Sequence, residues 1–239
     1  MTWLIDVPEL ERAIVRHCSP TLAALKPASL FTFPGAFVAQ DNIDEASATQ
    51  RRQALLSAIS FCKNQIADAG LDICVLSWKS CGALVYVYRP QTLTRFIADP
   101  RAAATLSAVG YRTEDLSSCL ELLGNRLSRK TLSAETARSA APCPRKKTSC
   151  TREFPHEIGF FLGYPYEDVL GFIKNRGKNY VAVGPWKVYE NKERALATFE
   201  RYRSCSRAYA RAYRRGCRLA RLAIRPRTHH SVIRPDLRA

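Results

Sequence analysis

The sequence predicts a single α/β domain, with α+β as the alternative: a small mixed sheet flanked by several helices, followed by a basic C-terminal tail that is helical or disordered. The chain has 239 residues, 46% of them hydrophobic, which is enough for one substantial core. Short β-branched and aromatic runs are interspersed with segments of helical periodicity. Twelve arginines and one acid lie after position 200, so +11 of the formal charge of +16 belongs to the end of the chain.

The N-terminal quarter contains signals for a helix, a strand and a second helix. The first helix is predicted to begin after Asp6 and to end or bend at Pro20. A short strand is expected over residues 25–33 because apolar and aromatic residues there precede a Pro-Gly pair. The second helix is predicted to begin after Asp44, to carry its apolar residues on one face and to stop at Gly70.

Residues 73–78 and 83–88 are predicted to form a hairpin. Both runs are β-branched and aromatic, and the link between them contains a glycine. We expect them to be the central strands of the sheet. Helices are then predicted to begin near three positions: Thr92, Pro100 and Thr113.

The domain is predicted to comprise residues 1–130 and 151–205. Between them, residues 131–150 are rich in Ala, Ser, Pro and basic residues and show no periodicity, which predicts a flexible surface insertion. Residues 206–239 form the predicted arginine-rich tail.

The densest stretch of the chain runs from Phe154 to Tyr189. Pro155 and Pro165 are placed at predicted helix starts, and two short strands are expected on either side of Gly184. We expect most of the glycines, prolines and aromatic residues of this block to serve folding.

Composition favours a cytosolic protein. The N-terminus lacks the basic start and apolar run of a signal peptide, and no apolar stretch is long enough to span a bilayer. The nine cysteines are an odd number and include no CxxC pair, so we predict free thiols and no metal site.

His156 and Glu157 are the strongest candidates for chemistry. A helix N-terminus favours a neutral imidazole, which a general base requires. The alternative is that Glu157 complements the helix dipole while His156 caps or packs. His17 and Cys18 are neighbours in sequence and do not face each other on a helix, so a nucleophilic Cys18 would need His156 from across the fold. The alternative for Cys18 is a buried structural thiol.

Four polar residues adjoin predicted strand ends, where α/β proteins gather ligand contacts: Lys26, Arg89, Lys187 and Tyr189. The alternative for each is a solvated surface position. The sequence contains no GxGxxG, Walker A, HExxH or GxSxG motif, and it identifies no cofactor.

The predicted tail offers a polyanion-binding surface. Its arginines recur at steps of three or four, which aligns them on one helical face: Arg203, Arg207, Arg211, Arg214 and Arg218. Such a stripe can bind RNA, DNA or an anionic membrane surface. Residues 158–169 also have the spacing of a helix-turn-helix, but Glu167 and Asp168 would then face the DNA phosphates and be repelled.

Several motifs resemble a family of uncharacterised bacterial proteins, domain of unknown function 3793: FPHEIGFFLGYPYEDVLGFI, GKNY, WKVY and, near the start, HCSPTLAALKPASLF. The resemblance implies a shared fold and a shared site around five residues: His156, Glu157, Lys26, Cys18 and Lys187. It implies no activity. The arginine-rich extension after Cys205 departs from the family pattern.

Three functions remain open. The first is a small-molecule-binding protein, or a thiol- or histidine-dependent enzyme, with a site between HCSPTLAALKP and the HEIG block, the dense stretch from Phe154 to Tyr189. The second is a nucleic-acid-binding or regulatory protein that uses the helix-turn-helix-like block and the arginine stripe. The third is a non-catalytic module that binds a protein partner.

Overall fold

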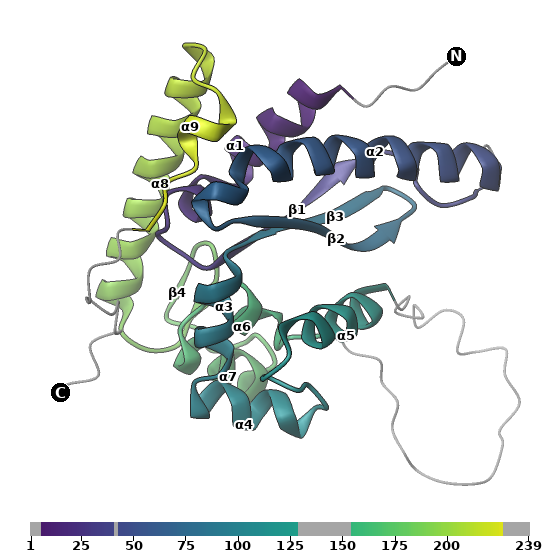
Figure 1. The fold of residues 1–239 in the computed structure, drawn as a ribbon. Coiled ribbons are helices and arrows are strands. Elements are labelled where there is room, and N and C mark those ends of the chain that lie inside the picture. The colour runs from purple at the N-terminus through teal and green to yellow at the C-terminus, as the bar shows by residue number, and fades with distance from the viewer. Residues whose placement is uncertain (1–5, 41–42, 129–153, 227–239) are drawn as a thin grey trace, which may run out of the picture.

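A three-stranded antiparallel sheet forms the middle layer of the structure (Figure 1). The computed structural model describes residues 6–40, 43–128 and 154–226. The strands β1 (Ala28–Pro34), β2 (Asp72–Lys79) and β3 (Gly82–Tyr88) pair in the order β1-β3-β2. The central strand, β3, has the sequence GALVYVY, a continuous apolar run that suits contact with helices on both faces.

The predicted single domain, with helices around a small sheet, is confirmed. The hairpin expected over residues 73–88 is β2 and β3. All strands that the structure describes pair in antiparallel fashion, so α+β is the closer description of the two predicted classes.

Two helices cover one face of the sheet: α1 (Val7–Leu22) and α2 (Glu45–Ile66), the latter followed by the short 3-10 helix η1 (Ala67–Ala69) (Figure 1). Pro20 lies inside α1, which continues for two more residues. Asp44 caps α2, and its carboxylate accepts a hydrogen bond from the backbone N–H of Ser47 at 2.6 Å. The chain leaves η1 through Gly70 in the left-handed region, as the sequence predicted.

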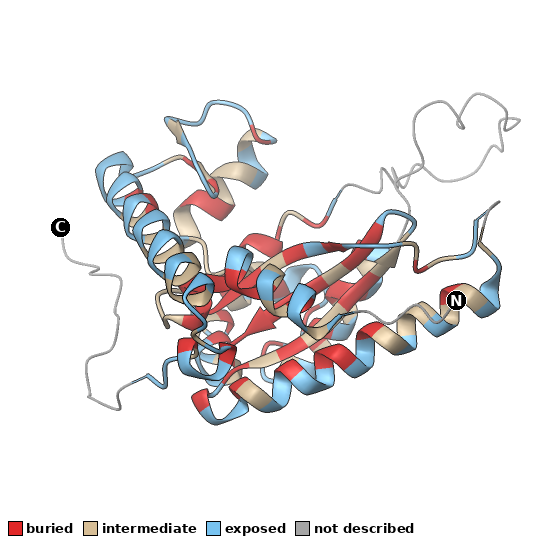
Figure 2. Cartoon of the chain, turned by 90° about the horizontal axis from the view of Figure 1, so that it is seen from above, coloured by how far each residue is buried: buried red, intermediate tan, exposed pale blue. Residues whose placement is uncertain are grey.

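Five helices pack on the opposite face: α3 (Pro90–Ile97), α4 (Pro100–Ala108), α5 (Leu116–Ser128), α6 (Ile158–Phe161) and α7 (Tyr166–Asn175). Figure 2 shows that buried residues gather on the sheet and on the sides of the helices that face it. Tyr86 joins this layer to the sheet, because its buried hydroxyl donates a hydrogen bond to the carbonyl oxygen of Phe161 at 2.5 Å.

Gly163 fixes the HEIG block against the loop between α1 and β1. Its φ is +70°, and a Cβ built at this position would lie 2.3 Å from the ring of Pro27. Only glycine satisfies both the backbone angle and this contact. The approach holds the loop that carries Lys26 in one place.

The C-terminal part adds a two-stranded sheet, β4 (Ala182–Val183) and β5 (Lys187–Val188), and then α8 (Lys192–Arg214) and α9 (Leu219–Leu222). Asn191 caps α8, and its side-chain oxygen accepts a hydrogen bond from the backbone N–H of Arg194 at 3.2 Å. Helix α8 runs along α1 at one side of the molecule (Figure 1). No helix in the described ranges is long and apolar enough to cross a membrane.

The structured domain extends beyond the predicted boundary at residue 205. Helix α8 continues to Arg214, and Leu219 and Leu222 are buried in the core beneath α1 and α2. The backbone N–H of Ile224 donates a hydrogen bond to Leu22 at 3.0 Å. The prediction assigned residues 206–226 to a tail because it counted their charges. The few apolar side chains among them pack against the core. The predicted insertion at 131–150 and the remainder of the tail after residue 226 lie outside the described residues.

Arg89 is buried, contrary to its prediction as a surface or ligand-binding residue. Only 2% of it is exposed, and its guanidinium donates four hydrogen bonds to backbone carbonyl oxygens. The acceptors are Thr21 at 2.9 Å, Leu22 at 2.9 Å, Ala69 at 2.8 Å and Ile224 at 2.7 Å. Within the described residues it has no carboxylate partner, so the peptide dipoles alone solvate the charge.

Replacing Arg89 by methionine removes all four of these hydrogen bonds, although the carbonyl oxygens of Thr21 and Leu22 keep the bonds that they accept from the backbone N–H groups of Ala24 and Ile224. We expect R89M to lower the free energy of unfolding by about 2–5 kcal/mol, because the lost bonds come from a charged donor and each buried acceptor left unsatisfied costs about 1–3 kcal/mol. Urea denaturation measures the change. R95M, at an exposed position on the next helix, is the control, with an expected change within about 0.5 kcal/mol. Equal losses in the two variants would exclude Arg89 as an anchor.

Candidate functional site

Glu157 is a buried structural acid. Arg126 Nη1 on α5 donates to Glu157 Oε1 at 2.5 Å, and the Tyr111 hydroxyl donates to the same oxygen at 3.1 Å. The second guanidinium nitrogen of Arg126 also donates to the carbonyl of Val109. These bonds tie α5 to the start of α6, and they occupy the carboxylate that was a candidate for catalysis.

His156 lies in an aromatic cluster rather than beside Cys18. Its ring centroid is 6.0 Å from that of Phe154 and 4.9 Å from that of Phe172. This is the packing role that the sequence left open for it. The structure does not bring His156 and Glu157 together with Cys18 in one cavity, and the geometry therefore lends no support to a Cys18–His156 pair.

Lys187 and Tyr189 hold the chain around β5. Lys187 Nζ donates to the Gly177 carbonyl at 2.6 Å and lies 4.8 Å from the ring centroid of Tyr180. The ring of Tyr189 packs so closely on Gly171 that a Cβ there would lie 2.4 Å from it. Both residues are engaged in local packing, not in a shared pocket with Lys26.

Asp168 organises the same segment, a role that sequence reasoning missed. Its buried carboxylate accepts hydrogen bonds from the indole N–H of Trp186 at 2.6 Å and from the backbone N–H groups of Tyr189 at 2.7 Å and Glu190 at 3.2 Å. The sequence placed Asp168 only in the first turn of a helix. The Gly-Pro-Trp turn was the one sequence signal near these partners. It does not identify Asp168, because the partners lie 18 to 22 residues after it in the chain.

Cys18 is fully buried on α1. Burial raises the pKa of its thiol to about 12, and the nearby Lys26 ammonium and Ser29 hydroxyl offset this only in part. The thiol is therefore protonated at neutral pH, as in the alternative prediction of a structural cysteine. All seven cysteines in the described ranges are free, and those ranges contain no group of three or more His, Cys, Asp or Glu side chains that could hold a metal ion.

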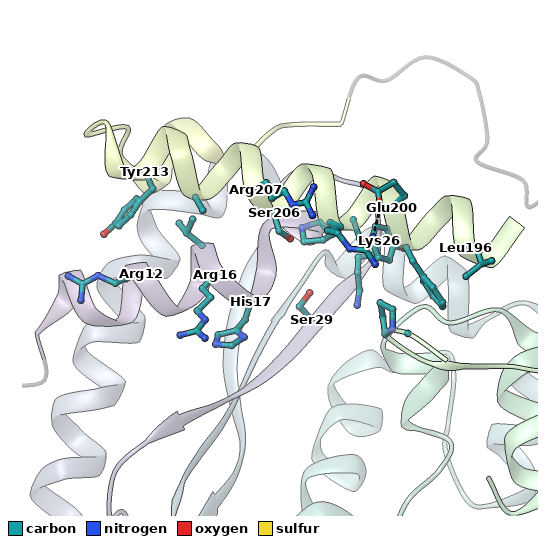
Figure 3. Close-up of a pocket in the computed structure, with 18 of the residues that line it drawn as sticks. Arg12, Arg16, His17, Lys26, Ser29, Leu196, Glu200, Ser206, Arg207 and Tyr213 are labelled. Atoms are coloured by element: carbon teal, nitrogen blue, oxygen red, sulfur yellow. Dashed lines mark hydrogen bonds and ion pairs between the residues drawn. The ribbon is translucent and has the colours of Figure 1, made fainter. Parts of the chain in front are cut away.

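A groove of about 1020 Å³ lies between α1 and α8 (Figure 3). Helix α1 forms one wall and α8 the other, and the chain between β4 and β5 also contributes to the lining. Ser29 of β1 lies at the floor between the two helices. We define this cavity as the α1–α8 groove.

The α1–α8 groove is strongly cationic. Six cationic side chains line it: Arg12, Arg16, Lys26, Arg203, Arg207 and Arg214. Of the lining residues only Glu200 is acidic, and its carboxylate is paired with Arg203 at 2.5 Å. The walls therefore carry a net charge of +5 when His17 is neutral.

Two groups in the groove, Lys26 and His17, have lowered pKa values. Burial lowers the pKa of the Lys26 ammonium to about 8, and the nearby Cys18 opposes this shift. Burial, followed by the charge of Arg16, also lowers the pKa of His17. The His17 ring stacks on Phe31, with centroids 5.3 Å apart and the planes inclined by 11°. The groove thus combines fixed guanidinium charges with a neutral imidazole and a readily deprotonated amine.

The sequence analysis named several residues of this groove but did not predict that they lie in one cavity. Residues of the HCSPTLAALKP segment line the groove, and α8 forms the opposite wall. From the stretch between Phe154 and Tyr189 the lining includes Val183, Gly184 and Pro185, and not His156 or Glu157. Of the predicted arginine stripe, Arg203, Arg207 and Arg214 line the groove, whereas Arg211 and Arg218 are exposed outside it. The spacing of Arg12 and Arg16, four residues apart, was the signal for the α1 wall.

Comparison with protein families gives one match, to "Protein of unknown function (DUF3793)", over residues 14–223. The chain belongs to this family. The match continues past Cys205 to residue 223 and includes the arginines of the α1–α8 groove on α8, so residues 206–223 of the extension that we predicted to depart from the family pattern lie within it. No curated protein and no solved structure is significantly similar to the chain.

The protonation state of Cys18 is open to a direct test. At pH 8 a thiol with a pKa of about 12 is ionised in only about one molecule in 10,000, and the side chain is buried as well. We expect iodoacetamide to alkylate the exposed Cys81 in the native chain and to leave Cys18 unmodified until denaturant is added. Peptide mass spectrometry measures both. Native alkylation of Cys18 at the rate of Cys81 would contradict its structural role.

Proposed function

We propose that the chain binds a small anionic ligand in the α1–α8 groove. The observation that carries the proposal is the charge of the walls, six cations against one carboxylate that is already paired. Arginines fixed on facing helices can donate paired hydrogen bonds to phosphate or carboxylate oxygens, which makes these groups the best match for the site.

The apolar end of the groove indicates what the rest of the ligand is. Val183 and Leu196, which lie at the end nearest the β4–β5 turn, are 61% and 45% exposed, and Phe199 lines the groove beside them. Arg12 and Tyr213 lie toward the other end (Figure 3). An elongated ligand with an apolar or aromatic part and a phosphate or carboxylate part would cover both ends.

A nucleic acid is the second candidate, favoured by the exposed Arg211 and Arg218, which extend the positive surface of the C-terminal helices beyond the groove. The helix-turn-helix-like block does not add to this candidate. Helix α6 is a single turn, Glu167 is paired with Arg101 at 3.3 Å, and Asp168 is buried. The acids that argued against DNA contact in the sequence are used for packing.

Variants that remove single positive charges distinguish anion binding in the groove from nonspecific electrostatic attraction to a basic protein. We expect R16Q and R207Q each to weaken binding of adenosine triphosphate or inorganic pyrophosphate by roughly tenfold or more, because each removes a charge-assisted contact worth about 1.5–3 kcal/mol. Isothermal titration calorimetry at fixed ionic strength measures the affinity.

The matched control is R211Q, which removes the same charge from α8 outside the groove. Binding by R211Q should be unchanged within about twofold, which corresponds to about 0.4 kcal/mol. Equal weakening by R207Q and R211Q would reject a defined site. A short single-stranded oligonucleotide that binds more tightly than either small anion, and that depends on Arg211 and Arg218, would favour the nucleic-acid candidate instead.

A further inference from the structure

Lys26 differs from the other cations of the α1–α8 groove in its surroundings. It is a primary amine, and in the described part of the chain its Nζ makes no hydrogen bond or ion pair. Its contacts are the ring centroids of Tyr164 at 5.4 Å and Tyr202 at 5.9 Å. No carboxylate therefore holds it in the ammonium form.

The backbone around Lys26 is fixed from three sides. Pro27 follows it directly and is clamped by Gly163, and the backbone N–H of Leu25 donates to the Pro20 carbonyl at 2.8 Å. Arg89 binds the carbonyl oxygens of the last residues of α1. The amine is thus presented to the groove from a rigid support, which is what reaction with a bound ligand requires.

Charged and titratable groups meet the Lys26 amine from each element that packs on it. These are Cys18 on α1, Tyr164 in the turn between α6 and α7, and Tyr202 on α8. With a pKa of about 8, about one Lys26 side chain in ten is an uncharged nucleophile at pH 7, against a few in ten thousand for an ordinary lysine. Neutral His17 in the same groove can accept and return a proton.

From this arrangement we propose that Lys26 captures the carbonyl group of a small anionic aldehyde or ketone as an imine, while the groove arginines bind the anionic group of the same molecule. The inference rests on the proposed anion site and names the class of ligand. The Nζ lone pair attacks the carbonyl carbon and gives a carbinolamine after proton transfer to oxygen. That oxygen then leaves as water when the C=N bond forms, with no change of oxidation state.

Pyridoxal 5′-phosphate serves as a probe because it is an aldehyde with a phosphate, and pyridoxal is its matched control without the phosphate. The full chain is incubated with each, sodium cyanoborohydride reduces any imine to a stable amine, and peptide mass spectrometry locates the adduct. We expect Lys26 to be the main site, with at least about tenfold faster labelling by the phosphorylated aldehyde.

Two other lysines provide internal controls. Lys192 is exposed on α8, and Lys187 Nζ is bonded to the Gly177 carbonyl, so both should label slowly. K26R should abolish the main adduct because a guanidinium does not form an imine under these conditions, and R207Q should slow labelling of Lys26. Because the wild-type chain reports the site by itself, a K26R variant that failed to fold would leave the test intact.

The outcomes distinguish this inference from the proposed function. If pyrophosphate binds in an Arg207-dependent manner but Lys26 is labelled no faster than Lys192, imine capture is rejected and the anion site stands. If labelling of Lys26 is fast but independent of phosphate and of Arg207, the amine is reactive without help from the groove arginines. The inference that the ligand is an anionic aldehyde or ketone is then rejected. If neither binding nor selective labelling is seen, both are rejected.

Discussion

The fold depends on the placement of one buried guanidinium. Arg89 leaves the central strand of the sheet and binds the end of α1, the end of η1 and the segment after α9. These parts lie 20 to 135 residues away from it in sequence. Without this residue, the end of α1, the end of η1 and the segment after α9 would each lose a hydrogen-bond donor, and a buried carbonyl oxygen left without a donor costs stability. Burial lowers the pKa of Arg89 to about 10, which still leaves it charged at neutral pH.

The same interaction determines the geometry of the α1–α8 groove. It fixes the last turn of α1, from which the loop bearing Lys26 begins, and it holds Ile224 just after the two C-terminal helices. The HEIG block contributes from the other side of the sheet through Gly163 and Pro27. The family motif and the N-terminal motif therefore meet, but as a support for one lysine rather than as two halves of a catalytic pair.

Local signals in the sequence were sufficient for most elements. The hairpin of β2 and β3 follows from two apolar runs and a short link, and the start of α8 follows from Asn191. Roles that depend on distant partners were out of reach. Glu157 is paired with Arg126, which lies 31 residues earlier in the chain. Arg89 binds backbone carbonyl oxygens, which every residue type has, so no residue pattern in the sequence identifies its partners.

The groove shows the same division. The periodicity of arginines on α8 was readable, but which of them share a wall depends on how α8 lies against α1, and charge counting assigned the later ones to a tail. The sequence left two roles open for Cys18, a nucleophile and a buried structural thiol. Burial decides whether the thiol is ionised, and burial depends on the whole fold.

The like charges that line both walls of the α1–α8 groove have an energetic consequence for the protein without a bound ligand. Guanidinium groups on both walls repel, and α8 is attached to the core chiefly along α1, so this repulsion acts on the contact between the first helix and α8. Counter-ions weaken this repulsion at ordinary ionic strength. A multivalent anion in the groove would replace the repulsion by attraction and join the two ends of the chain, so that occupancy and the integrity of the fold are thermodynamically linked.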